Sequence, residues 1–180
     1  MLTTAEHDSK IKRVIISKEE IDHAIKQVGE EISKEYDGKP VLLVSVLKGA
    51  FVFMADLCRA LSIPVEIDFM SASSYGAGTV SSGTVRIDFD VKHDISNYHV
   101  IIVEDIIDTG RTLKEIVRLL NTRHPLSLKV VTLLDKPSRR VVEFEADKAL
   151  FTIPDLFVIG YGLDCDEYFR NLPYIAEYKE

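Results

Sequence analysis

The chain has 180 residues, of which 46% are hydrophobic and 28% charged, and a formal net charge of −7. This length suits one domain with its own hydrophobic core and disfavours two domains. The acidic balance argues against a sequence-independent nucleic-acid binder, which carries a basic stripe, and no apolar run approaches the roughly 18 residues of a membrane span.

The N-terminal part of the chain predicts a strand followed by a helix. Residues 12–17 form a short β-branched run, which is typical of a strand. Ser17 and Glu20 have the spacing of a capping box, so a helix begins there. The helix is expected to run to about Tyr36, because Asp37-Gly38 is a stop signal.

Three strands and a helix are expected next. Residues 41–46 are apolar on both faces, as in a central strand of a parallel sheet, and residues 50–61 predict a helix. Apolar and polar residues alternate in residues 64–70 and 84–92. This period of two predicts strands with one face toward water.

A Ser- and Gly-rich stretch, residues 71–83, separates these two alternating strands. Its composition alone is that of a flexible hairpin connection. Its 13 residues exceed the usual length of such a connection, and long loops in small domains are often functional. We therefore expect a mobile lid loop.

The second half of the chain continues to alternate strands and helices. This rhythm predicts an α/β domain with a mostly parallel sheet flanked by helices. The expected strands are residues 99–105, 129–134, 155–162 and 174–179, and the expected helix is 111–123.

Polar residues follow the apolar run 100–103 directly. Glu104 and Asp105 come first, then two isoleucines, then the stretch 108–112, DTGRT. Ligands of an open parallel sheet bind beyond the carboxyl ends of its strands. Gly110 permits a positive φ, so that backbone N–H groups converge, and the helix that follows adds its N-terminal dipole. The pattern predicts a phosphate cradle without a lysine.

Two adjacent carboxylates beside a phosphate site indicate a second kind of contact. A carboxylate only accepts hydrogen bonds, so the pair suits the vicinal hydroxyls of a ribose phosphate. The alternative is that Glu104 and Asp105 are ordinary acids before a helix and that Asp108 caps that helix.

The stretch VIIVEDIIDTGRTL resembles the phosphoribosyl pyrophosphate motif of the type I phosphoribosyltransferases. From about Val14 to Tyr178 the chain resembles the hypoxanthine-guanine phosphoribosyltransferases in particular. The segments that carry this resemblance are Leu47-Lys48-Gly49, the loop with Ser74-Tyr75, LLDKPSRR and PDLFVIGYGLDCDEYFRNLPYI.

The resemblance implies a single domain with the type I phosphoribosyltransferase fold, over residues 1–180. Its core would span about 37–155, and a small hood subdomain would combine 1–16 with 156–180. The lid would be 71–83, with Ser74 and Tyr75 as its site residues. A homodimer or homotetramer is expected, without a choice between the two.

The same resemblance implies a reaction, a cofactor and a set of site residues. The 5-phosphoribosyl group of phosphoribosyl pyrophosphate would pass to N9 of hypoxanthine or guanine through an oxocarbenium-like transition state, with Mg²⁺ as cofactor. The implied ribose ligands are Glu104 and Asp105; the phosphate ligands are Asp108, Thr109, Gly110, Arg111 and Thr112; the pyrophosphate ligands are Lys48, Gly49 and Arg170; the purine ligands are Lys136, Phe157, Val158 and Asp164; and the metal ligands are Asp164, Glu104 and Asp105.

Two of these residues would decide the chemistry of the purine. Asp108 is the candidate general base at N7. Lys136 carries a donor-only ammonium, which suits the 6-oxo group of hypoxanthine or guanine and not the 6-amino group of adenine. The preference between hypoxanthine and guanine, and the use of xanthine, stay open.

Three other functions are alternatives for this sequence. They are a transferase for adenine, orotate or uracil, a non-catalytic regulator that binds nucleic acid, and a receiver domain with Asp108 as phospho-acceptor. Lys136 and the segment FVIGYGLD argue against another base. The four residues Asp108, Lys136, Asp164 and Arg170 in an acidic chain argue against the regulator, and the GRT cradle, which receivers lack, argues against a receiver domain. Cys58 and Cys165 form no CxxC pair, and the polar N-terminus lacks the apolar core of a signal peptide, so we expect a cytoplasmic protein.

Overall fold

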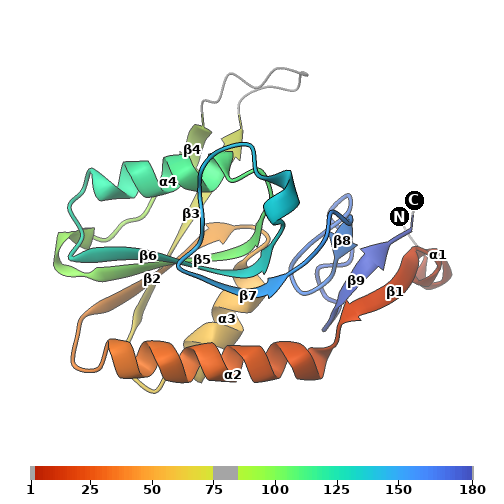
Figure 1. The fold of residues 1–180 in the computed structure, drawn as a ribbon, viewed down its shortest axis with the longest axis horizontal. Helices are drawn as coiled ribbons and strands as arrows, with labels where there is room; N and C mark the ends of the chain where they lie inside the picture. The colour runs from red at the N-terminus through yellow and green to blue at the C-terminus, as the bar shows by residue number, and fades with distance from the viewer. Residues whose placement is uncertain (1–2, 75–84, 180) are drawn as a thin grey trace.

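The computed structural model describes residues 3–74 and 85–179, and a six-stranded sheet forms its centre (Figure 1). Every neighbouring pair in this sheet is parallel except β3 and β4. In spatial order the strands are β4 (Val85–Phe89), β3 (Glu66–Ser74), β2 (Val41–Leu47), β5 (His99–Ile107), β6 (Ser127–Asp135) and β7 (Lys148–Thr152).

Helices cover both faces of the sheet (Figure 1). The helices α2 (Lys18–Glu35) and α3 (Phe51–Ala60) lie on one face, and α4 (Arg111–Asn121) lies on the other. Strand β2 is buried on both sides, with Leu43 in the core under α2 and α3 and Leu42 in the core under α4. Successive side chains of a strand point to opposite faces, which explains why an uninterrupted apolar run is needed here.

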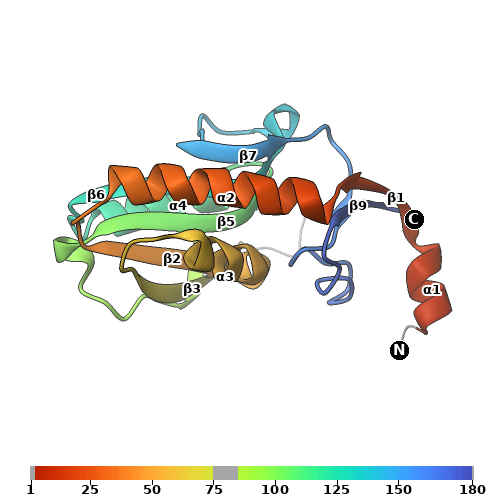
Figure 2. The ribbon, with the colours of Figure 1, turned by 90° about the horizontal axis from the view of Figure 1, so that it is seen from below.

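A second, small antiparallel sheet lies at one end of the molecule, with helix α1 (Thr4–Ser9) beyond it (Figure 2). Its strand order is β1 (Ile11–Ile16), β9 (Ile175–Tyr178) and β8 (Val158–Ile159). Both ends of the described chain contribute to it. Two short 3-10 helices, η1 (Ile95–Asn97) and η2 (Pro137–Arg139), complete the elements.

Most predicted elements are confirmed within one or two residues of their predicted ends. The capping box of Ser17 and Glu20 is present, and α2 ends at Glu35 with Tyr36 as its C-cap. One predicted strand, 155–162, is wrong in length, because only Val158–Ile159 is a strand and it belongs to the small sheet. Strand β7 was not predicted, because its five residues carry no alternation of polar and apolar side chains.

The predicted lid loop 71–83 begins too early. Residues 71–74 belong to β3 and pair with β4 through the backbone. Tyr75 and the rest of that prediction lie outside the part of the chain that the structure describes.

The predicted wet face of the strand 64–70 is reversed at two positions. Ile67 is 45% exposed, whereas Asp68 is only 8% exposed. Asp68 can be buried because its carboxylate accepts the backbone N–H groups of Phe69, Lys92 and His93, at 2.8–3.2 Å, and contacts His93 Nδ1 at 2.7 Å. Burial raises the pKa of Asp68, but these hydrogen bonds outweigh burial and leave the pKa below its ordinary value.

Within residues 3–74 and 85–179, no helix combines the length and the apolar character that crossing a bilayer requires.

Candidate active site

A cavity of about 280 Å³ lies beyond the carboxyl ends of β2, β3 and β5, where the parallel strands meet the N-terminus of α4. Strand direction alone explains this placement, because all parallel strands end at the same edge. The residues that line the cavity are Val46, Leu47, Gly49, Ala72, Glu104–Gly110, Thr112 and Leu113.

Glu104 and Asp105 are half-buried at the end of β5. Burial, and then the charge of Asp105, raises the pKa of Glu104 well above its ordinary value. Burial also raises the pKa of Asp105 to about 6, against the hydrogen bond from the Ile106 N–H. Glu104 Oε2 is buried and has no hydrogen-bond partner among the residues that the structure describes. Glu104 Oε2 is therefore available to a hydroxyl or a cation, whereas Asp105 already accepts the Ile106 N–H.

The stretch 108–112 forms the predicted turn into α4. Gly110 has φ = 79° and is the N-cap of the helix. This backbone conformation favours glycine, since L side chains rarely adopt it. Thr109, Gly110 and Thr112 line the cavity at the positive end of the helix dipole. This geometry suits a phosphate.

Gly49 brings the loop after β2 against the acidic pair. The Leu47–Lys48 peptide bond is cis. A Cβ atom on Gly49 would lie 1.6 Å from Oδ2 of Asp105, and one on Gly162 would lie 2.1 Å from the Gly49 carbonyl oxygen. Three segments distant in sequence thus meet at this point, and only glycine fits at two of them.

Lys48 and Arg170, the two predicted pyrophosphate ligands, meet at Glu167. Lys48 Nζ lies 2.9 Å from Glu167 Oε1, and Arg170 Nη2 lies 3.0 Å from Glu167 Oε2. Arg170 also pairs with Asp164 at 2.8 Å and donates to the Gly162 carbonyl at 2.8 Å. The hydrogen bonds from Lys48 and then Arg170 lower the pKa of Glu167. Sequence reasoning missed Glu167, which lies in the quoted C-terminal segment without any signal of its own.

The three predicted metal ligands do not form a preformed cage. Across residues 3–74 and 85–179, no group of three or more His, Cys, Asp or Glu side chains could hold an ion. Asp164 does act on Asp105 electrostatically, raising its pKa, so the acids share one region. Mg²⁺ prefers one or two carboxylates together with substrate phosphates and water. The carboxylate oxygens and the unpaired Glu104 Oε2 fit such a partly assembled site.

Lys136 lies at the end of β6 and is only 7% exposed. Its backbone N–H donates to the Ile107 carbonyl at 3.0 Å, which fixes the segment beside Asp108. No carboxylate among the described residues forms a salt bridge with the ammonium. Lysine is rarely buried to this extent, which makes Lys136 a candidate for contact with a ligand.

Phe157 and Val158 lie at the start of β8 in the small sheet. Phe157 is 53% exposed and packs edge-on against Tyr178, with 5.4 Å between ring centroids. Val158 is buried and pairs with Glu177. Neither residue lines the 280 Å³ cavity. The exposed ring is available for stacking. Of the predicted site residues, those that line the cavity are Gly49, Glu104, Asp105, Asp108, Thr109, Gly110 and Thr112, and the predicted phosphate ligand Arg111 is not among them.

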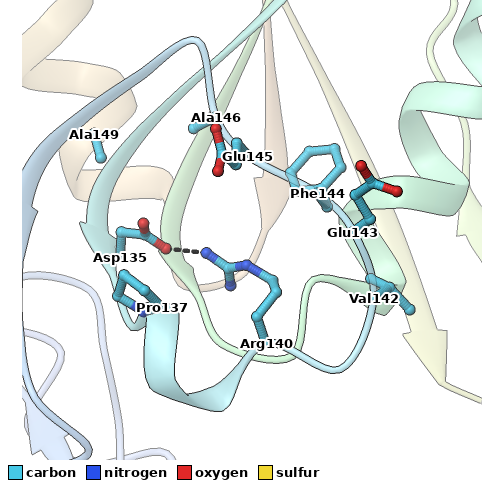
Figure 3. Close-up of a pocket in the computed structure, with 9 residues that line it drawn as sticks. All are labelled: Asp135, Pro137, Arg140, Val142, Glu143, Phe144, Glu145, Ala146 and Ala149. Atoms are coloured by element: carbon cyan, nitrogen blue, oxygen red, sulfur yellow. Dashed lines mark hydrogen bonds and ion pairs between the residues drawn. The ribbon is translucent and has the colours of Figure 1, made fainter.

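A larger cavity of about 680 Å³ adjoins this region (Figure 3). None of the predicted site residues lines it. Its walls are the end of β6, the turn after it and the segment leading to β7, and the guanidinium of Arg140 points at Asp135 across it. The lining residues are Asp135, Pro137, Arg140, Val142, Glu143, Phe144, Glu145, Ala146 and Ala149.

Comparison with known proteins agrees with this geometry. The family model described as "Phosphoribosyl transferase domain" matches residues 9–166. The hypoxanthine-guanine phosphoribosyltransferase of Streptococcus pneumoniae is 51% identical over 173 residues, 96% of each chain. The hypoxanthine phosphoribosyltransferase of Buchnera aphidicola is 48% identical over 167 residues, 92% of this chain and 94% of the other.

Solved structures show the same similarity. A hypoxanthine phosphoribosyltransferase from Staphylococcus aureus matches with a TM-score of 0.93 and 45% identity, over 99% of this chain and 97% of the other. A hypoxanthine-guanine phosphoribosyltransferase from Bacillus anthracis matches with a TM-score of 0.89 and 45% identity, over 93% and 99%. The fold and the site define a phosphoribosyl-transferring enzyme of the type I class. The chain belongs to the phosphoribosyltransferase family, among relatives that are hypoxanthine and hypoxanthine-guanine phosphoribosyltransferases.

Proposed function

We propose that this enzyme salvages purines by transferring the 5-phosphoribosyl group of phosphoribosyl pyrophosphate to N9 of hypoxanthine or guanine. The products are IMP or GMP and pyrophosphate. The observation that carries the proposal is the cavity in which Glu104, whose Oε2 lacks a donor, and Asp105 lie beside a helix N-terminus and Gly49. The near full-length similarity to hypoxanthine-guanine phosphoribosyltransferases supports the same substrates.

The ribose phosphate would bind along the end of β5. Glu104 and Asp105 would accept the ribose hydroxyls, and Thr109 to Thr112 would hold the 5-phosphate by hydroxyls, backbone N–H groups and the dipole of α4. Arg111, the first residue of α4, would add a cation to this cradle. These contacts orient C1′ toward the purine, which converts a bimolecular step into a positioned one.

Lys48, Gly49 and Arg170 would bind the pyrophosphate that leaves. Arg170 supplies a planar fork for phosphate oxygens and Lys48 a point charge. Glu167 occupies both cations in this structure, so pyrophosphate would exchange with an internal carboxylate. Mg²⁺, held by Asp164 with Glu104 and Asp105, would neutralise negative charge on the pyrophosphate oxygens.

The purine would bind between Lys136 and the ring of Phe157. The ammonium would donate to the 6-oxo group, the backbone of Val158 would read the N1 edge, and Asp164 would lie on the same side. As the lone pair of N9 attacks C1′, the C1′–O bond to pyrophosphate breaks and the N7 proton passes to Asp108. The transition state would have oxocarbenium character.

The test is a steady-state assay with phosphoribosyl pyrophosphate and magnesium, run separately with hypoxanthine, guanine, xanthine and adenine. We expect nucleotide from the 6-oxopurines, none from adenine, and loss of turnover when magnesium is chelated. The ratio of hypoxanthine to guanine turnover measures the preference between the two bases. Absence of turnover with all four bases would refute the proposal.

We further propose that the enzyme acts in the cytoplasm as a homodimer or homotetramer. Its two cysteines are free thiols, as a reducing compartment favours. Light scattering of the purified chain would measure its mass, and a monomer at all concentrations would contradict the assembly.

A further inference from the structure

The turn after β6 forms hydrogen bonds with the backbone around Asp108. Three successive carbonyl oxygens, those of residues 107–109, accept hydrogen bonds from the single segment 136–141. In chain order the donors are the Lys136 N–H to Ile107 at 3.0 Å, Arg140 Nη1 to Asp108, and the Val141 N–H to Thr109 at 3.1 Å. The position of the Asp108 backbone is therefore set by this turn.

The side chain of Asp108 is held by the same turn. Arg139 Nε donates to Asp108 Oδ1 at 3.0 Å, and it lies 3.7 Å from Oδ1 of Asp155. The hydrogen bond to Asp108 is the largest cause of a raised pKa of Arg139. Asp155 precedes Phe157 in the chain, so one guanidinium connects the candidate base with the segment that carries the purine-stacking ring.

We propose that Arg139 is the positioning residue of the general base. It occupies Oδ1 of Asp108 and leaves Oδ2 to accept the N7 proton of the purine. This inference rests on the proposed function. A carboxylate turns freely about its last bond unless a partner restrains it, and a proton acceptor must meet its proton within hydrogen-bond distance. The exposed pair has a small electrostatic weight, so that orientation dominates.

A purely structural role for Arg139 is less consistent with the contacts. The turn is already anchored by Arg140, whose guanidinium donates to the Asp108 carbonyl. The same guanidinium also pairs with the Asp135 carboxylate (Figure 3). About half of the Arg139 side chain is exposed, and within the described residues it forms ion pairs with the carboxylates of Asp108 and Asp155. Its removal should leave the fold intact while it releases Asp108.

The test is a double-mutant cycle with Arg139→Gln and Asp108→Asn, measured as kcat/KM for hypoxanthine at saturating phosphoribosyl pyrophosphate. We expect Arg139→Gln to lower this value roughly 10-fold, as misorientation of a catalytic group does, and to have no effect in the Asp108→Asn background. The KM for phosphoribosyl pyrophosphate should stay within about twofold, because the phosphate ligands are untouched.

Two further variants serve as comparisons in this experiment. Arg139→Lys keeps a cation and a donor without the planar fork, so its activity should lie between wild type and Arg139→Gln. Arg118→Gln is the matched control, since Arg118 pairs with Glu115 on the surface of α4 and should leave kcat/KM unchanged. If Arg139→Gln does not fold, as judged by circular dichroism, the double-mutant cycle is measured with Arg139→Lys instead.

The outcomes separate this inference from the proposed function. A wild-type enzyme without turnover on any purine would refute the function itself. An active wild type in which Arg139→Gln lowers kcat/KM equally with and without Asp108 would overturn the inference alone. So would an effect confined to the KM for phosphoribosyl pyrophosphate, because Arg139 would then act on the phosphates.

Discussion

The two lysines of the site, Lys48 and Lys136, lie in opposite environments. The Lys48 side chain is 66% exposed and pairs with Glu167. Lys136 is 7% exposed and forms no salt bridge within the described residues. An exposed ion pair is weak and easily exchanged, whereas a lysine is seldom buried as far as Lys136 is. We therefore expect Lys48, the proposed pyrophosphate ligand, to exchange anions, and Lys136, the proposed purine ligand, to select one substrate.

Replacing the buried lysine should give the largest effect. In Lys136→Gln the ammonium becomes an amide that both donates and accepts, so that discrimination between a 6-oxo and a 6-amino group is lost. We expect kcat/KM for hypoxanthine to fall roughly 100-fold and the ratio of hypoxanthine to adenine turnover to shrink. Competition assays with the two bases measure this ratio.

Loss of all activity in Lys136→Gln without any gain in relative use of adenine would show that the lysine does more than read the 6-position. Lys129→Gln is a control for loss of lysine charge near the same strand, because Lys129 pairs with Glu35 away from the cavity.

Replacing the exposed lysine should act on the other substrate. We expect Lys48→Gln to raise the KM for phosphoribosyl pyrophosphate about 10-fold, since one charge-assisted contact to phosphate is lost. The KM for hypoxanthine should change little. Initial rates over a grid of both substrates separate the two constants, and an equal rise in both would remove the contrast between the two lysines.

The raised pKa of Asp105 leads to a prediction about protein stability. Its folded pKa, about 6 through burial, exceeds its ordinary value of 3.8. The folded state therefore binds the proton more tightly, so the stability that Asp105 contributes is present below about pH 4 and is lost as pH rises through 6.

Asp105→Asn should consequently raise the free energy of unfolding at pH 7.5 by about 1–2 kcal/mol, with little change at pH 4. The same variant should lose transferase activity. Urea unfolding at the two pH values measures the difference, and an equal effect at both would show that ionisation of Asp105 is not the cause.

The smallest expected effect is that of Glu167→Gln. Without the carboxylate that bridges Lys48 and Arg170, pyrophosphate competes with Asp164 alone, which still pairs with Arg170, so the KM for phosphoribosyl pyrophosphate should fall about two- to threefold. Product inhibition by pyrophosphate should strengthen in parallel. A raised KM would show that Glu167 supports the site instead of occupying it.

Much of this site follows from local sequence signals. The run of four aliphatic residues predicted β5, Gly110 predicted the turn into α4, and the order of elements placed both beyond the same sheet edge. These signals are local because a cap, a turn or a buried strand depends on neighbours within a few residues. The Ser17 capping box was predictable for the same reason.

Other features depended on partners far away in the chain. Asp68 is buried because backbone donors 24 and 25 residues later reach it, against the alternation that predicted a wet side chain. Arg139 meets Asp108 across 31 residues, and Glu167 meets Lys48 across 119. No period or short motif encodes such contacts.

The sequence by itself determined the α/β class, most strands and helices in their order, the turn at 108–112 into α4 and the family to which the chain belongs. Only the tertiary structure decided that Lys136 is buried, that Gly49 touches Asp105, that Glu167 joins both pyrophosphate cations and that Arg139 holds the candidate base. The physical reason is that elements form from short-range preferences, whereas burial and charge pairing depend on which elements packing brings together.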